Sequence, residues 1–191
     1  MTMSRLLLVI LAALCALDAA AQTGQQPGAN PLSTWLRDAF TRNGGTILRT
    51  AEKMPEENYG LRPGPQMEVR TFGQQVGHLA NYNYLWCSQS KGEKNPNTND
   101  LTKLSTKAEF IKALTDAFAY CSGAYSSLTD ASGAEMIDIT QENGRTTRNL
   151  RMALLILNYG HNNEIYGSMV SYLRMKSIVP PASEPRPAQK Q

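Results

Sequence analysis

The C-terminal run HNNEIYGSMVSYLRMKSIVPPAS constrains the fold most, because it places His161 on the apolar face of a predicted helix. Apolar side chains recur there at spacings of three, four or seven residues, which is the period of an amphipathic helix. The helix is expected from about Thr147 to Lys176, and Pro180-Pro181 end whatever follows it. Its predicted stripe contains Leu150, Leu154, Leu157, His161, Ile165 and Tyr172.

A helical period also covers the segment from about Leu32 to Lys53, which ends before Met54-Pro55. Gly44 and Gly45 lie in its middle, and each weakens a helix by about 1 kcal/mol relative to alanine. We therefore expect a kink there or the close approach of a neighbouring helix. The predicted stripe contains Trp35, Ala39, Ile47, Leu48 and Ala51.

Two capping boxes predict the starts of two further helices. Thr71 pairs with Gln74, and Thr106 pairs with Glu109, each at the spacing that lets the two side chains cap the first turn. The polar loop KGEKNPNTND separates these helices. Their predicted apolar positions are Phe72, Val76, Leu79 and Trp86 in one, and Phe110, Leu114, Ala117, Phe118, Cys121 and Leu128 in the other.

The connector EMIDITQENGRTTR leads to the last helix. Ile137 and Ile139 alternate with Asp138, and Asn143-Gly144 can make a tight turn, so we expect a short irregular or hairpin connection. Four amphipathic helices with one long crossover between the second and the third predict an all-α four-helix bundle.

The segment Met1 to Ala21 has the three parts of an export signal. Arg5 is followed by an apolar stretch of about a dozen residues and then by Ala19 and Ala21, which predict a cut before Gln22. An uncleaved N-terminal anchor is the alternative. We expect an exported chain, periplasmic or secreted, with a flexible linker at 22–30, one domain at 31–183, a disordered tail at 184–191 and no later membrane span.

Charge and motifs exclude several classes of function. The formal net charge is +3, and the basic residues are scattered among acids, so no nucleic-acid partner is expected. The sequence has no glycine-rich phosphate loop after a strand, no zinc-type cysteine spacing and no nucleophile elbow. Nucleotide-dependent enzymes and serine hydrolases are therefore disfavoured.

Three stretches of the chain resemble the DinB family, in the DinB/YfiT-like superfamily of metalloenzymes, and its exported members in particular. They are AEKMPEENYGLRP, MEVRTFGQQVGHLANYNYLWC and the C-terminal run. The resemblance implies a four-helix bundle of the DinB/YfiT-like type, which often forms a homodimer. It also implies a metal site with one histidine on the second helix and two histidines, one turn apart, on the last.

His78 and His161 match two of these ligands, whereas Ile165 stands where the third belongs. The chain has two histidines in total, so the three-histidine site cannot form. A carboxylate can complete a two-histidine site for zinc, nickel or manganese. The candidates are Glu164, Glu68 and Asp138. The alternative is a hydrogen-bonded histidine pair in a vestigial pocket.

Other polar residues are candidates for the same pocket, because they lie within a turn of one histidine or the other. They are Asn81, Tyr82, Asn158 and Asn162, with Ile165 beside them. Alternatively they face solvent or tie helices together. Arg174 matches a frequent arginine of the family, and it can cap the end of the last helix.

Cys87 and Cys121 remain after the predicted cut. In an oxidising compartment two cysteines can form a disulfide, and the resemblance to exported relatives favours pairing or close packing. The alternatives are two small buried apolar residues or, least favoured, a catalytic thiol, because neither cysteine has a histidine or cationic run beside it.

Two classes of function follow. The resemblance implies a metal-dependent enzyme, such as a thiol-dependent transferase or a hydrolase. Export would remove such an enzyme from the cytosolic thiol pool, and the third histidine is missing. We therefore favour a non-catalytic binding or interaction protein of the cell envelope, with an unknown small ligand.

Overall fold

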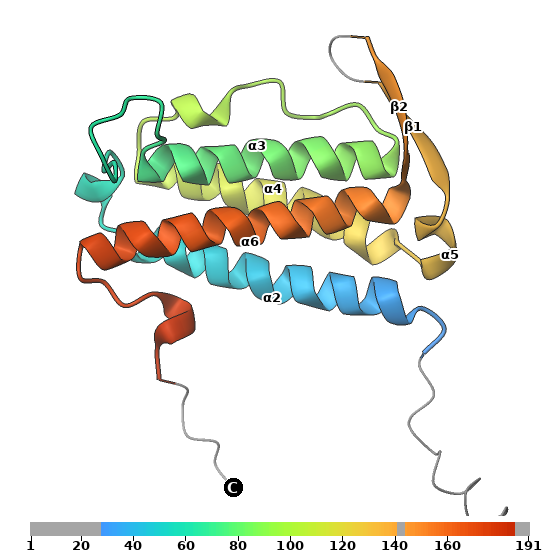
Figure 1. The fold of residues 1–191 in the computed structure, drawn as a ribbon, viewed down its shortest axis with the longest axis horizontal. Coiled ribbons are helices and arrows are strands. Elements are labelled where there is room, and N and C mark those ends of the chain that lie inside the picture. The colour runs from blue at the N-terminus through green and yellow to red at the C-terminus, as the bar shows by residue number, and fades with distance from the viewer. Residues whose placement is uncertain (1–27, 141–143, 186–191) are drawn as a thin grey trace, which may run out of the picture. The chain divides into compact units, whose positions relative to one another are not determined.

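A bundle of four long helices makes up most of the computed structural model, which describes residues 28–140 and 144–185 (Figure 1). Its helices are α2 (Pro31–Lys53), α3 (Phe72–Lys91), α4 (Lys107–Ser127) and α6 (Arg151–Met175). The short helix α5 (Asp130–Gly133) and the strands β1 (Met136–Thr140) and β2 (Thr146–Leu150) connect α4 to α6. Short 3-10 turns lie at Glu56–Asn58, Leu101–Lys103 and Pro181–Ser183. The predicted all-α bundle is confirmed.

The predicted export signal at residues 1–21 lies outside the described part of the chain. So do most of the linker and residues 186–191 of the tail. No helix in the described residues is both long enough and apolar enough to cross a membrane.

Helices α3 and α4 run in the same direction, because the segment between them returns along α3 (Figure 1). Gly73 faces Phe110 near their starts, and Cys87 bonds to Cys121 near their ends. The predicted crossover is therefore present. Gly77 allows its close passage, since a Cβ there would overlap the main-chain oxygen of Leu101.

Both predicted capping boxes are formed. The Thr71 hydroxyl accepts from the amide of Gln74, whose side chain accepts from the amide of Thr71. Thr106 and Glu109 make the same pair of hydrogen bonds. A third box, Thr129 with Ser132, starts α5 and was not predicted. Its four-residue helix carries too few apolar positions to show a period.

Helix α2 continues through Gly44 and Gly45 without a break. A Cβ on Gly44 would lie 3.4 Å from the ring of Phe118, so the glycine marks a close approach to α4. Beside it, Phe40 stacks on Tyr125 with 3.9 Å between ring centroids. The expected burial of Trp35 is wrong: its side chain is 59% exposed, because the neighbouring Leu36 faces the core instead.

The hairpin corrects the predicted start of the last helix. Residues from Thr147 to Leu150 are extended, and they pair antiparallel with β1, with Asp138 opposite Arg148. Cross-strand hydrogen bonds and the β-branched threonines of β2 favour strand over helix. Ile139 is buried on the inner face of the hairpin. Gly144 has a φ of +80°, whereas Asn143 of the predicted turn lies outside the described residues.

Helix α6 presents a different face to the core from the one expected. Leu157 is 56% exposed and Leu150 lies in β2, whereas two asparagines are buried. The helix is rotated toward them because they find hydrogen-bond partners inside the core. Arg174 lies exposed in the last turn. The buried residues of α6 are Leu154, Leu155, Asn158, Asn162, Ile165, Met169, Tyr172 and Leu173.

Candidate functional site

His78 and His161 meet between α3 and α6, which run in opposite directions (Figure 1). Their Nε2 atoms lie 3.0 Å apart. His78 is 7% exposed, and the imidazole of His161 is 15% exposed. The structure thus brings the two predicted histidines into direct contact.

Glu164 determines how the protons of this histidine pair are arranged. Its Oε2 atom lies 3.4 Å from Nδ1 of His161, on the far side of that ring from His78. An ionised carboxylate only accepts hydrogen bonds, so Nδ1 of His161 carries the proton. Nε2 of His161 is then an acceptor, and Nε2 of His78 donates to it. The partners thus assign one tautomer to each ring.

Both imidazoles are held neutral. Burial lowers the pKa of His78 to about 4, and the positive charge of Arg70 acts in the same direction, as does the repulsion that would arise if His161 were also protonated. Burial also lowers the pKa of His161, although the hydrogen bond that this ring donates to Glu164 opposes the effect. At neutral pH the pair therefore has nitrogen lone pairs but no charge.

We expect the thermal midpoint of unfolding to fall as the pH is lowered from about 7 to about 4. Histidine in the unfolded chain takes up a proton near pH 6.5, whereas native His78 stays neutral to about pH 4, so acid favours the unfolded state in this window. Thermal unfolding at several pH values checks this. The thermal midpoint should depend less steeply on pH in His78→Gln, because this variant lacks the titration of His78 while its carboxylates titrate as in the unmodified protein. An equal dependence on pH in the two proteins would contradict the lowered pKa of His78.

The residues around the pair do not assemble a three-ligand metal site. Ile165, at the third ligand position, is 5% exposed and packs in the core. Glu164 contacts the outer nitrogen of His161, while Glu68 is exposed. Asp138 pairs with Arg148 on the hairpin. Within residues 28–140 and 144–185, no three His, Cys, Asp or Glu side chains are placed to hold a metal ion.

Two aromatic side chains extend the pair along α3. The ring of Tyr82 lies 4.5 Å from that of His78 and 4.9 Å from that of His161, between centroids. Trp86 lies 5.1 Å from His161 and 4.9 Å from Tyr82. Trp86 was predicted only as an apolar helix position, although it follows Tyr82 by one turn on the same face.

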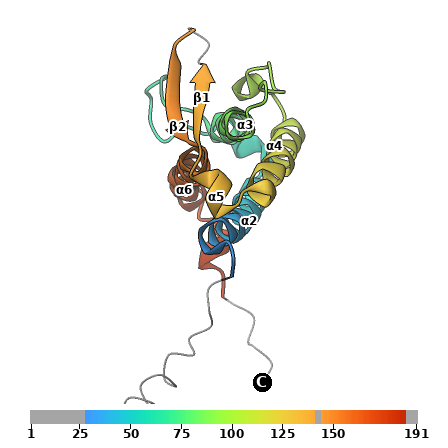
Figure 2. The same ribbon diagram turned by 90° about the vertical axis from the view of Figure 1, so that its right-hand side faces the viewer.

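Tyr82 and Trp86 also line an open groove with a volume of about 860 Å³. It lies between α3, the loop at 95–100, the hairpin and the start of α6, and Figure 2 shows the hairpin standing beside α3. Asn81, a predicted pocket residue, holds the loop: its oxygen accepts from Asn97 (3.1 Å) and from the amide of Leu101 (3.2 Å). The lining residues are Asn81, Tyr82, Leu85, Trp86, Gln89, Asn95, Asn97, Thr98, Asn99, Asp100, Ile139, Thr147, Asn149, Leu154 and Leu157.

Asn158 and Asn162 lie in the core and do not line the groove. Both donate to Oδ1 of Asn83, at 3.1 and 3.2 Å, and Asn83 donates back to Asn162 at 2.9 Å. Tyr125 donates to Asn158 at 2.7 Å. These bonds tie α3, α4 and α6 together. Asn83 was not predicted, although it lies on the apolar stripe of α3 between Val76 and Cys87.

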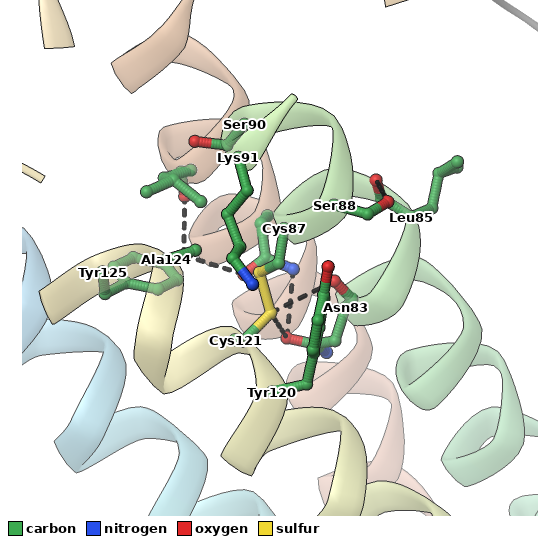
Figure 3. The surroundings of a disulfide bond; sticks show 12 residues. Asn83, Leu85, Cys87, Ser88, Ser90, Lys91, Tyr120, Cys121, Ala124 and Tyr125 are labelled. Carbon is green, nitrogen blue, oxygen red and sulfur yellow. Dashed lines mark hydrogen bonds between the residues drawn. A yellow bond between two sulfur atoms is a disulfide. The ribbon is translucent and has the colours of Figure 1, made fainter. Parts of the chain in front are cut away.

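Cys87 on α3 and Cys121 on α4 form a disulfide, with 5.3 Å between their Cα atoms (Figure 3). Both residues are fully buried. Sγ of Cys121 lies 3.1 Å from the main-chain oxygen of Asn83. A disulfide sulfur carries no proton, so this approach is a packing contact. The disulfide and the asparagine network therefore adjoin each other on the inner face of α3.

The fold and the site define a class of protein: a four-helix bundle with a long crossover and a histidine contact between its second and last long helices. The chain belongs to the DinB superfamily, whose family model matches residues 39–163. Comparison with curated proteins finds no match.

Solved structures of two DinB-like proteins and of a third protein have the same fold. The one from Bacillus cereus is 16% identical, with a TM-score of 0.63, covering 76% of this chain and 93% of its own. YjoA from Bacillus subtilis is 18% identical, with a TM-score of 0.61, covering 82% and 99%. A conserved protein from Enterococcus faecalis is 12% identical, with a TM-score of 0.60, covering 75% and 96%. Identities this low support a shared fold alone.

Proposed function

We propose that this chain is an exported, non-catalytic binding protein of the cell envelope that takes a small ligand in the groove beside the histidine pair. The observation that carries this proposal is the groove itself, whose aromatic residues Tyr82 and Trp86 rest on His161. The histidine pair then supports the wall of a binding site. Ile165, buried at the third ligand position, agrees with a role without a metal.

Two features support export. The N-terminal segment has the composition of a signal peptide. Cys87 and Cys121 are joined by a disulfide, a bond that persists in oxidising compartments and is rare in the cytosol. The periplasm or the cell exterior is therefore the proposed location.

A homodimer remains a prediction of the resemblance. Leu32 and Trp35 are 64% and 59% exposed, and they lie one turn apart on α2. They offer an apolar surface against which a second copy could pack.

The second candidate is a metal-dependent enzyme, of the thiol-dependent transferase or hydrolase type. The approach of the two Nε2 atoms to 3.0 Å favours it, because one ion could be flanked by both. A water or a carboxylate such as Glu164, after a change of rotamer, would have to complete the site. This candidate makes a distinct prediction about metal content.

We would purify the chain from Gln22 onward without a histidine tag and load it with zinc, nickel or manganese. Elemental analysis should then find less than about 0.1 equivalent of metal. Ile165→His should bind about one equivalent, because it places a second imidazole one helical turn from His161. Ile165→Gln is the matched control, since it also puts a polar side chain into the core but adds no imidazole.

Two outcomes would count against this account. About one equivalent of metal in the unmodified chain would favour the enzyme and overturn the binding-protein proposal. If Ile165→His folds but binds no more metal than Ile165→Gln, then the three positions do not converge on one point.

A further inference from the structure

We infer that the ligand of the groove is a neutral oligosaccharide. This inference rests on the proposed function, because it specifies what the groove binds. The volume of about 860 Å³ lies in the upper part of the range for small-molecule sites, so the groove can take more than one sugar ring.

The groove combines aromatic rings with many side-chain amides. Tyr82 and Trp86 provide ring faces, whose negative quadrupole attracts the weakly positive C–H groups on one face of a sugar ring. An amide offers both donors and an acceptor, which match a hydroxyl that donates and accepts at one oxygen. Six amide side chains line the groove: Asn81, Gln89, Asn95, Asn97, Asn99 and Asn149.

The polar wall is held in place before any ligand arrives. Asn97 donates to Asn81 and to the main-chain oxygen of Asn99, at 3.1 and 2.9 Å. Asp100 accepts from Thr102 and Asn81 at its Oδ1 atom. These bonds order the loop, so less conformational entropy is lost when a ligand binds.

The two aromatic side chains are also held in place, because each packs against other rings. Tyr82 packs on both histidines, and Trp86 packs on His161 and Tyr82. Rings held by such contacts form a rigid platform for stacking. The histidine pair therefore positions the aromatic side chains of the groove.

The charge of the groove disfavours ions of either sign. Among the described lining residues none is Lys, Arg or His, and Asp100 is the one carboxylate. Hydrogen bonds from Thr102 lower the pKa of Asp100, so it stays charged and repels anions. Oδ1 of Asp100 already accepts from Thr102 and Asn81, and Oδ2 lies 3.7 Å from Lys103, so a cation would have to displace these partners to bind the carboxylate. A neutral, hydroxyl-rich ligand fits this balance best.

Tryptophan fluorescence provides a direct reporter, because the chain has two tryptophans and Trp35 lies on α2, outside the groove. In Trp35→Phe, Trp86 is the one remaining tryptophan. We would express the full chain with export to a bacterial periplasm and titrate this variant with neutral glucan, mannan and chitin fragments, at up to about 10 mM. At least one should change Trp86 emission saturably, whereas spermidine, inorganic phosphate and tetra-alanine should not.

Variants identify the binding surface by calorimetry on the responding sugar. Trp86→Ala should weaken binding at least about tenfold, because a stacking surface is lost, whereas Trp35→Ala should not change it. Asn149 and Arg148 are neighbours on opposite faces of β2. Asn149→Ala should weaken binding about three- to tenfold, and Arg148→Ala should leave it unchanged. The β2 pair remains informative if Trp86→Ala does not fold.

Three results would overturn the inference. They are no response to any neutral sugar, a response to spermidine, phosphate or peptide alone, or sugar binding that Trp86→Ala and Asn149→Ala both leave intact. A response to one of the other ligand classes at Trp86 would leave the binding-protein proposal standing. That proposal fails separately, through about one equivalent of bound metal.

Discussion

Replacing both Cys87 and Cys121 with alanine is expected to lower the free energy of unfolding by about 3 to 4 kcal/mol. The disulfide closes a loop across a sequence separation of 34 residues. Removing it restores the loop-closure entropy of the unfolded chain, which for a loop of this length is worth about that much. Urea unfolding of the exported protein at pH 7 measures the loss, because the unfolding slope shows whether the denatured state has expanded.

Reduction separates the bond from the side chains that form it. A thiol reductant should destabilise the unmodified protein by a similar amount and should leave the double alanine variant unchanged. Both cysteines are fully buried, so the double variant can lose somewhat more through packing. If reductant does not shift the unfolding curve of the unmodified protein, Cys87 and Cys121 are not joined in solution.

The disulfide helps to position the groove, because one face of α3 lines the groove and another packs in the core. Tyr82 and Trp86 face the groove, while Asn83 and Cys87, one position further along, face the core. Successive residues of a helix are turned by about 100°, so the same two turns carry both sets. The internal bonds of Asn83 and Cys87 thus hold the helix that presents the aromatic residues.

The parts of the fold that were predicted from sequence depend on local signals. The capping boxes at Thr71 and Thr106 satisfy main-chain groups within four residues, and they set the starts of α3 and α4 correctly. The start of α6 was misplaced because Leu150 and Leu154 also fit a helical spacing. Pairing with β1 decided the conformation of Thr147 to Leu150, and that pairing joins two separate segments.

The candidate site was less predictable for a related reason. The roles of His78 and His161 followed from resemblance to a family. Asn83 was not predicted, and in the sequence it is one polar residue in an apolar stripe. The cost of burying an asparagine depends on partners from other helices. Because Asn158 and Asn162 bond to Asn83, α6 turns them inward and leaves Leu157 exposed beside the groove.

Asn83→Leu is expected to destabilise the protein by about 3 to 5 kcal/mol. The substitution removes the acceptor of two buried amides, those of Asn158 and Asn162, and the donor to the oxygen of Asn162. All three asparagines are fully buried, so water cannot replace these bonds, and each unpaired group costs about 1 to 3 kcal/mol. Urea unfolding at pH 7 measures the change.

Two further variants separate the hydrogen-bond network from packing. Asn163→Ala loses two exposed hydrogen bonds, one accepted from Asn43 and one donated to the main-chain oxygen of Tyr159, and should change stability by less than about 0.5 kcal/mol. The triple variant Asn83→Leu, Asn158→Leu, Asn162→Leu should recover much of the loss, because replacing all partners leaves few polar groups unpaired, and Tyr125 can still donate to the main-chain oxygen of Leu155. The contrary outcome is a triple variant with a lower free energy of unfolding than Asn83→Leu, as expected if Asn158→Leu and Asn162→Leu each add a further loss. The unpaired amides would then not be the source of the cost. The packing shape of the three asparagines would instead stabilise the contact between α3 and α6.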